Sequence, residues 1–127
     1  MHRQTILVTG ASGFIGKNVV KQISDKFPEL NFIETNSITS DDDLNIAVRD
    51  CDLVFHFAGA NRPPDDNYLT ANEELTSKLC RLCELHGGKE IIFSSSTHAT
   101  TENLYGVSKK NCEQILINYR SSLSKKT

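Results

Sequence analysis

Two spacings of apolar residues alternate along the chain. The run Thr5-Ile6-Leu7-Val8-Thr9 is short, β-branched and apolar, which is typical of a buried strand in a parallel sheet. From Phe14 onward the apolar residues recur at helical spacing until Pro28 ends the pattern. The first part of the chain therefore predicts a strand, a glycine-containing turn and a helix.

The same alternation continues to the end of the chain. Further strands are expected at 31–35, 52–58 and 90–94, and further helices at about 41–48, at 68–86 and from 105 onward. Strands that alternate with helices imply parallel pairing with right-handed crossovers and helices on both faces. The predicted fold class is α/β, a doubly wound parallel sheet of Rossmann type.

The polar run Thr39-Ser40-Asp41-Asp42-Asp43 resembles an acidic motif, but it stands directly before an apolar helical pattern. A hydroxyl that caps a helix and carboxylates in its first turn both complement the helix dipole. We interpret the run as the start of a short helix.

Length and charge limit the classes of partner. The 127 residues fit one domain over residues 1–120, followed by a polar tail at 121–127. The net charge of −2 gives no basic surface for nucleic acid or for an anionic membrane. No stretch approaches the roughly 20 apolar residues of a membrane helix, and the N-terminus does not resemble a signal peptide. We expect a cytoplasmic protein whose partners are small molecules or proteins.

Four cysteines lie within apolar periodic segments, as expected in a reducing compartment. Cys80 and Cys83 have the spacing of a redox pair or of half a zinc site, and His86 follows. Positions three apart on an amphipathic helix face the core together, and a structural zinc site needs four ligands. We favour buried thiols and expect no metal, with metal or redox chemistry as the alternative.

The clearest motif is Gly10-x-x-Gly13-x-x-Gly16, which follows a strand and opens a helix. Glycines allow a tight turn and close approach to a pyrophosphate, and the helix N-terminus favours its negative charge. The alternative is that these glycines serve only a turn and helix packing, in a domain that has lost its ligand. Gly10, Gly59 and the run Ser94-Ser95-Ser96 all follow strands, so we expect them at one crevice.

A second motif supplies candidate chemistry. Tyr105 and Lys109 are four residues apart and would share one helix face. A nearby cation stabilises a phenolate and lowers the pKa of tyrosine, which makes it a usable acid or base. The preceding run 94–97 offers a hydroxyl that can orient a substrate carbonyl.

Together these features resemble the extended short-chain dehydrogenase/reductases, the sugar-nucleotide epimerases, dehydratases and reductases. Thr9 to Gly16 match the family's T-G-x-x-G-x-x-G loop, and the resemblance makes Ser96, Tyr105 and Lys109 the catalytic triad. Segments 58–63 and 94–106 resemble the capsular-polysaccharide reductases of a UDP-linked 2-acetamido-2,6-dideoxyhexos-4-ulose. The candidate cofactor-binding residues are Gly10, Ser12, Gly13, Phe14, Ile15, Gly16, Glu34, Phe57, Ala58, Gly59, Tyr105 and Lys109.

The resemblance implies hydride transfer from NAD(P)H to the C4 ketone of a UDP-sugar in surface polysaccharide biosynthesis. Glu34, at the end of the second strand, favours NAD because a carboxylate binds ribose hydroxyls and repels a 2′-phosphate. The subgroup resemblance favours NADPH, so both cofactors stay open.

The family pattern is two to three times longer than this chain, which we therefore expect to be truncated after the catalytic helix. Its open sheet edge predicts a homo-oligomer. A dinucleotide-binding or vestigial module that acts only through association is the alternative to an enzyme.

Overall fold

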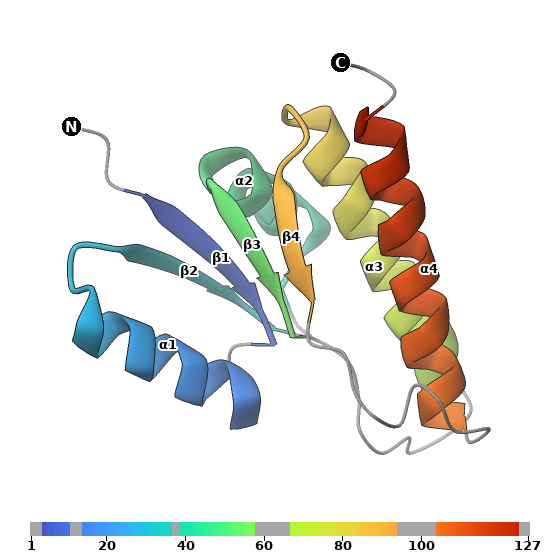
Figure 1. The fold of residues 1–127 in the computed structure, drawn as a ribbon, viewed down its shortest axis with the longest axis horizontal. Coiled ribbons are helices and arrows are strands. Elements are labelled where there is room, and N and C mark those ends of the chain that lie inside the picture. The colour runs from blue at the N-terminus through green and yellow to red at the C-terminus, as the bar shows by residue number, and fades with distance from the viewer. Residues whose placement is uncertain (1–3, 11–13, 37–38, 58–66, 94–103, 125–127) are drawn as a thin grey trace. The chain divides into compact units, whose positions relative to one another are not determined.

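The computed structural model describes residues 4–10, 14–36, 39–57, 67–93 and 104–124. At residues 14, 15, 67–72, 104–109 and 124 it describes the helical backbone alone. These parts belong to two compact units, one of residues 1–58 with 89–94 and one of residues 59–88 with 95–127. Figure 1 shows the elements of both. The two units are described in turn.

The first unit holds a parallel sheet. In chain order its strands are β1 (Thr5–Thr9), β2 (Asn31–Thr35), β3 (Leu53–His56) and β4 (Glu90–Phe93). Their order across the sheet is β2-β1-β3-β4, with every neighbouring pair parallel. The predicted doubly wound α/β fold is confirmed, although β3 is shorter than the predicted 52–58.

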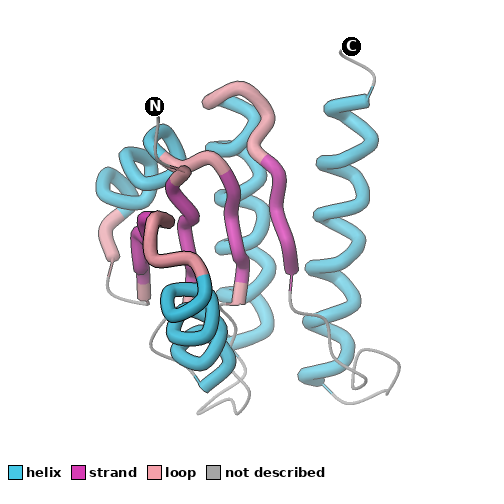
Figure 2. The backbone as a smooth tube through the Cα atoms, turned by 60° about the vertical axis from the view of Figure 1, so that its left-hand side comes forward, coloured by secondary structure: helices cyan, strands magenta, loops and turns pink. Residues whose placement is uncertain are grey.

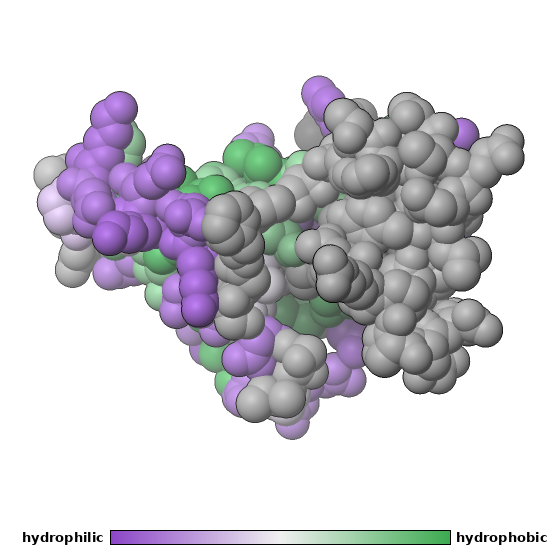
Figure 3. All heavy atoms as spheres, turned by 90° about the horizontal axis from the view of Figure 1, so that it is seen from below, coloured by the Kyte–Doolittle hydropathy of each residue, from purple (hydrophilic) through white to green (hydrophobic). Residues whose placement is uncertain are grey.

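Two helices lie on opposite sides of this sheet, α1 (Phe14–Lys26) and α2 (Asp41–Asp50), as Figure 2 shows. On the α1 side, Ile6 and Val8 of β1 form a buried core against which Val20 of α1 packs. Lys17 and Lys21 of α1 are exposed. Figure 3 shows that the surface of this unit is mostly hydrophilic, in purple, on the side of α1. Alternation along β1 therefore separates two cores, one for each helix.

The α2 core explains why that helix forms. Leu44, Ala47 and Val48 are buried at helical spacing, and Leu7 of β1 is fully buried on the α2 side of the sheet. Ser40 is the N-cap, and its Oγ accepts a hydrogen bond of 3.1 Å from the backbone N–H of Asp43. The interpretation of the acidic run as a capped helix start is confirmed.

The second unit is a pair of helices, α3 (Asn67–Leu85) and α4 (Leu104–Ser124), which lie side by side and run in the same direction (Figure 1). The buried side chains of this pair are at most 9% exposed and include Leu79, Cys80 and Cys83 of α3 and Cys112 and Tyr119 of α4. Helix α4 reaches Ser124, so it continues four residues into the segment 121–127 that the sequence assigns to a polar tail.

A glycine fixes one end of the helix pair. Gly88 follows α3 with a φ of +80°, and a Cβ there would lie 3.0 Å from Cδ2 of Leu123 on α4. Its N–H donates to the carbonyl of Cys83, which closes the C-terminus of α3. The predicted stop at Gly87-Gly88 is confirmed.

Among the helices in the described ranges, none has both the length and the apolar character needed to cross a bilayer.

Candidate functional site

Three strands of the first unit end together at one edge. Thr9 stands opposite Thr35 on one side and His56 on the other. The ladder continues past the strands, because the N–H of Gly10 donates to the carbonyl of Thr35 at 3.2 Å and the N–H of Phe57 donates to the carbonyl of Thr9 at 3.1 Å. From β1 the chain passes outward to β2 on one side and returns to β3 on the other. The carboxyl ends of β1 and β3 therefore define a topological switch point, where sheets of this kind bind ligands.

Gly10 directly follows β1 and is the first residue of the predicted glycine loop. Gly10 has a φ of +70°, a conformation that side chains rarely adopt, and α1 begins at Phe14. The first turn of a helix has N–H groups without intrahelical partners, and Gly16 is buried within α1. This arrangement fits a pyrophosphate. Ser12 and Gly13 of the predicted loop lie outside the described residues.

Glu34 and Phe57 flank this turn. Glu34 lies one residue before the end of β2, pairs through its backbone with Val8, and is exposed. An exposed carboxylate at this position fits a ribose that lies across the strand ends. Phe57 directly follows β3 and is partly buried against the core on the α1 side. Ala58 and Gly59, predicted beside it, lie outside the described residues.

One buried polar pair at this edge was missed by the sequence analysis. Oγ1 of Thr9 and Nδ1 of His56 are hydrogen-bonded at 2.7 Å, and the two residues are 2% and 0% exposed. Forty-seven positions separate them, so no local spacing links them. Alternation within the two strands could have placed both on one face, but only the register brings them opposite each other.

The candidate catalytic residues belong to the second unit or lie outside the described ranges. Tyr105 and Lys109 stand four residues apart in the continuous helix α4, as the sequence predicts, and for both the structure describes the backbone. Ser96 lies outside the described residues. The catalytic triad therefore stays a prediction.

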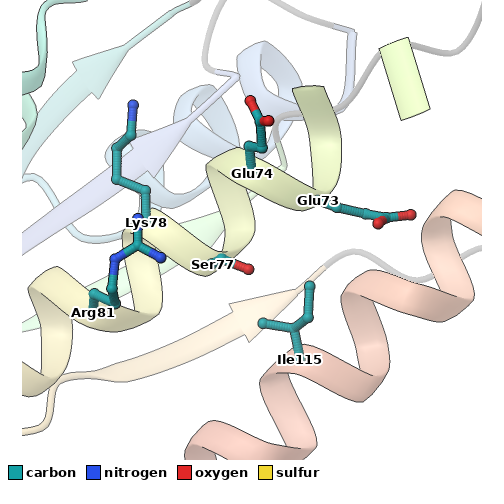
Figure 4. A pocket seen from close by; sticks show the side chains of 6 residues that line it. All are labelled: Glu73, Glu74, Ser77, Lys78, Arg81 and Ile115. Carbon is teal, nitrogen blue, oxygen red and sulfur yellow. The ribbon is translucent and has the colours of Figure 1, made fainter. Parts of the chain in front are cut away.

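The helix pair carries a shallow surface pocket of its own, shown in Figure 4. Helix α4 contributes Ile115 to its lining. Helix α3 contributes acidic, basic and hydroxyl side chains, which are Glu73, Glu74, Ser77, Lys78 and Arg81. Glu73 points toward α4, where Nδ2 of Asn111 donates to its Oε1 at 2.8 Å. Opposite charges along one helix face are typical of a solvated surface, and the pocket gives no further sign of a ligand.

The cysteine side chains of the helix pair are buried. Burial, with Cys112 nearby, raises the pKa of Cys80 to about 11. Burial, with the thiols of Cys83 and Cys80 beside it, also raises the pKa of Tyr119. The hydroxyl of Thr76, itself buried, donates to Sγ of Cys112 at 3.3 Å. Because the thiolate is the reactive and metal-binding form, these properties favour the buried-thiol interpretation of Cys80 and Cys83.

Parallel strands, a glycine turn at the switch point and a helix that begins there define a doubly wound nucleotide-binding class of fold. Within that class the chain belongs to the NAD dependent epimerase/dehydratase family, whose model matches residues 6–124.

Individual relatives agree with this family. The chain is 33% identical over 115 residues to a UDP-2-acetamido-2,6-beta-L-arabino-hexul-4-ose reductase of Pseudomonas aeruginosa, a match over 87% of this chain and 30% of the relative. It is 30% identical to the capsular polysaccharide assembling protein CapF of Staphylococcus aureus, with a TM-score of 0.73 over 92% of this chain and 32% of that structure. A GDP-L-fucose synthetase of Naegleria fowleri, solved bound to NADP, shares the fold at 18% identity, with a TM-score of 0.77 over 99% of this chain and 50% of that one. The chain therefore spans 30% of the length of the Pseudomonas reductase and 32% of the Staphylococcus structure.

Proposed function

We propose that this chain is the NAD(P)H-binding part of a nucleotide-sugar reductase or epimerase. The observation that carries the proposal is Gly10 at a φ of +70°, placed directly after β1 at the switch point of the sheet and just before α1. Backbone N–H groups at such a turn and at a helix N-terminus suit the pyrophosphate that joins the two halves of the cofactor.

The substrate we propose is a UDP-linked deoxyhexose with a ketone at C4, on the route to a surface polysaccharide. Support comes from the Pseudomonas reductase and the Staphylococcus capsular protein, each at least 30% identical to this chain. The matched region is about a third of each of these proteins, so the remaining sugar contacts would come from sequence outside it. A cytoplasmic location fits a reaction that consumes a nucleotide sugar and a soluble reduced cofactor.

When bound, the reduced nicotinamide would supply a hydride to C4 of the sugar, which is the carbonyl carbon. Tyr105 donates its phenolic proton to the carbonyl oxygen as negative charge develops there. Lys109, on the same helix, stabilises the resulting phenolate and binds the nicotinamide ribose. Ser96 donates a hydrogen bond to the same oxygen and orients the ketone.

Titration of the chain with NADH and with NADPH, followed by nicotinamide fluorescence, tests the binding step. Gly13→Asp should abolish binding, because it places a negative charge where the pyrophosphate lies. Gln22→Glu adds the same charge at an exposed position farther along α1 and serves as the matched control. Failure of the unaltered chain to bind either cofactor at millimolar concentration, or equal effects of the two variants, would contradict the proposal.

We further propose that the chain self-associates. β4 is an outer strand of the sheet in the described part of the chain, and its Ile92 is 50% exposed. An apolar residue on an edge strand favours pairing with a second sheet. Light scattering that shows a monomer at all concentrations would contradict this.

A further inference from the structure

We propose that Thr9 and His56 form a positioning pair that fixes where the cofactor loop begins. The inference rests on the proposed binding of a nicotinamide dinucleotide and adds two residues of the chain to that site. It assigns to them no contact with the cofactor, because both side chains are buried in the sheet.

Thr9 and His56 lie at the ends of their strands, next to the turn. Thr9 is the last residue of β1, and the chain turns at Gly10 immediately after it. His56 is the last residue of β3, and Phe57 follows. The side-chain bond between Thr9 and His56 therefore joins the two strands at their final register position, beside the switch point.

The backbone hydrogen bonds at the end of β1 depend on the position of Thr9. The carbonyl of Thr9 accepts from Phe57, and the N–H of Gly10 donates to Thr35. A shift of Thr9 would move both of these hydrogen bonds and with them the φ of +70° at Gly10. The side-chain bond of 2.7 Å therefore holds Thr9 in place directly before the turn.

Burial of the His56 side chain costs free energy unless its polar atoms are hydrogen-bonded. A histidine that is fully buried needs partners for its ring nitrogens, and an apolar side chain would fill the same space without that demand. The ring of His56 also lies 5.5 Å from the ring of Phe93, the last residue of β4. His56 therefore connects the ends of three adjacent strands, β1, β3 and β4, which a smaller or more flexible side chain would not do.

The test compares two buried threonines. Thr9→Val keeps the shape of residue 9 and removes the hydroxyl, and we expect it to weaken NADH binding by about tenfold, since a buried ring nitrogen loses this partner and the turn loosens. Thr9→Ser keeps a hydroxyl and should restore wild-type affinity. Thr76→Val removes an equally buried hydroxyl, the partner of Cys112 in the helix pair, and should leave affinity unchanged.

A double variant separates positioning from folding. Thr9→Val with His56→Phe removes both partners of this hydrogen bond, so neither is left buried without the other and the chain should fold even if Thr9→Val alone does not. We expect its melting temperature to recover while its NADH affinity stays low. Recovery of both, or equal losses of affinity in Thr9→Val and Thr76→Val, would overturn the proposal.

Amide hydrogen exchange distinguishes this failure from failure of the proposed function. Thr9→Val should speed exchange at Gly10 and Phe57 well beyond any change caused by Thr76→Val. If the unaltered chain binds neither cofactor but these amides respond in this way, the positioning role stands and the proposed function is wrong. If the amides do not respond, the positioning role is wrong whatever the chain binds.

Discussion

Buried polar groups are arranged differently in two regions of the molecule. One region is the edge of the sheet where β1 and β3 end, and the other is the pair of helices α3 and α4. At the strand edge a threonine bonds to a histidine on the next strand, and backbone hydrogen bonds continue past both residues. In the helix pair a threonine bonds to a cysteine, and burial raises the pKa of Cys80 and of Tyr119 in the same unit. The first arrangement holds the last residue of β1 directly before Gly10. The second forms a tightly packed core with no exposed chemistry among its described side chains, which teaches that burial of a polar group is by itself no sign of a site.

The comparison predicts that changes at the strand edge alter binding, whereas changes at the start of α4 alter turnover. Tyr105→Phe should lower kcat by about 10²- to 10⁴-fold, because the proton donor of the proposed reaction is lost. The affinity for NADH should stay nearly unchanged. The measurement is NADH consumption with a 4-keto sugar nucleotide, alongside a cofactor titration. Turnover at the wild-type rate would remove Tyr105 from the mechanism.

The buried thiol of Cys80 in the helix pair predicts that stability depends on pH. The pKa of Cys80 is raised from 9.0 to about 11, so the folded chain holds this proton more tightly than the unfolded chain. The stabilisation is complete below pH 9 and is lost as the pH rises toward 11. The free energy of unfolding should fall by about 3 kcal/mol over this window. Denaturant unfolding at several pH values measures it, and Cys80→Ala should give a flatter dependence. An equal slope in that variant would show that Cys80 does not control it.

At the strand edge, Glu34 should decide between the two cofactors. Glu34→Gln removes a charge that repels the 2′-phosphate of NADPH, so the ratio of NADPH to NADH affinity should rise by about tenfold. Competitive titrations with both cofactors measure the ratio. Glu29→Gln, at an exposed position before β2, is the matched control and should leave it unchanged. A ratio that moves equally in both variants would assign the effect to overall charge.

The smallest effect concerns a cap outside both regions. Ser40→Ala should destabilise the chain by about 1 kcal/mol, because the N–H of Asp43 loses its acceptor. Cofactor affinity should not change. Thermal unfolding measures the loss, and Ser40→Asp, which also caps, should show almost none. A fall in NADH affinity would connect α2 to the binding edge and weaken the contrast between the regions.

The sequence predicts the bounds of the helices and strands better than it predicts which strands lie next to one another. Helix α3 was predicted at 68–86 and lies at Asn67–Leu85, because its apolar positions repeat over many turns and two glycines end it. Helix α4 extends past the predicted end at 120, since a serine-rich segment carries no clear stop signal. The strand order β2-β1-β3-β4 and the Thr9–His56 pair were not predicted from local pattern. Both depend on register between strands far apart in the chain, which alternation within one strand does not encode.

The position of β1 has a consequence for synthesis. Both neighbours of this strand in the sheet, β2 and β3, come later in the chain. Its apolar residues Ile6, Leu7 and Val8 must therefore wait for β2 before either side can pair, and for β3 before both sides are covered. At the usual speed of a ribosome the first wait lasts roughly one to five seconds. Translation rate and chaperone access while the segment from β1 to β3 is made should thus influence how much of this protein reaches its native state.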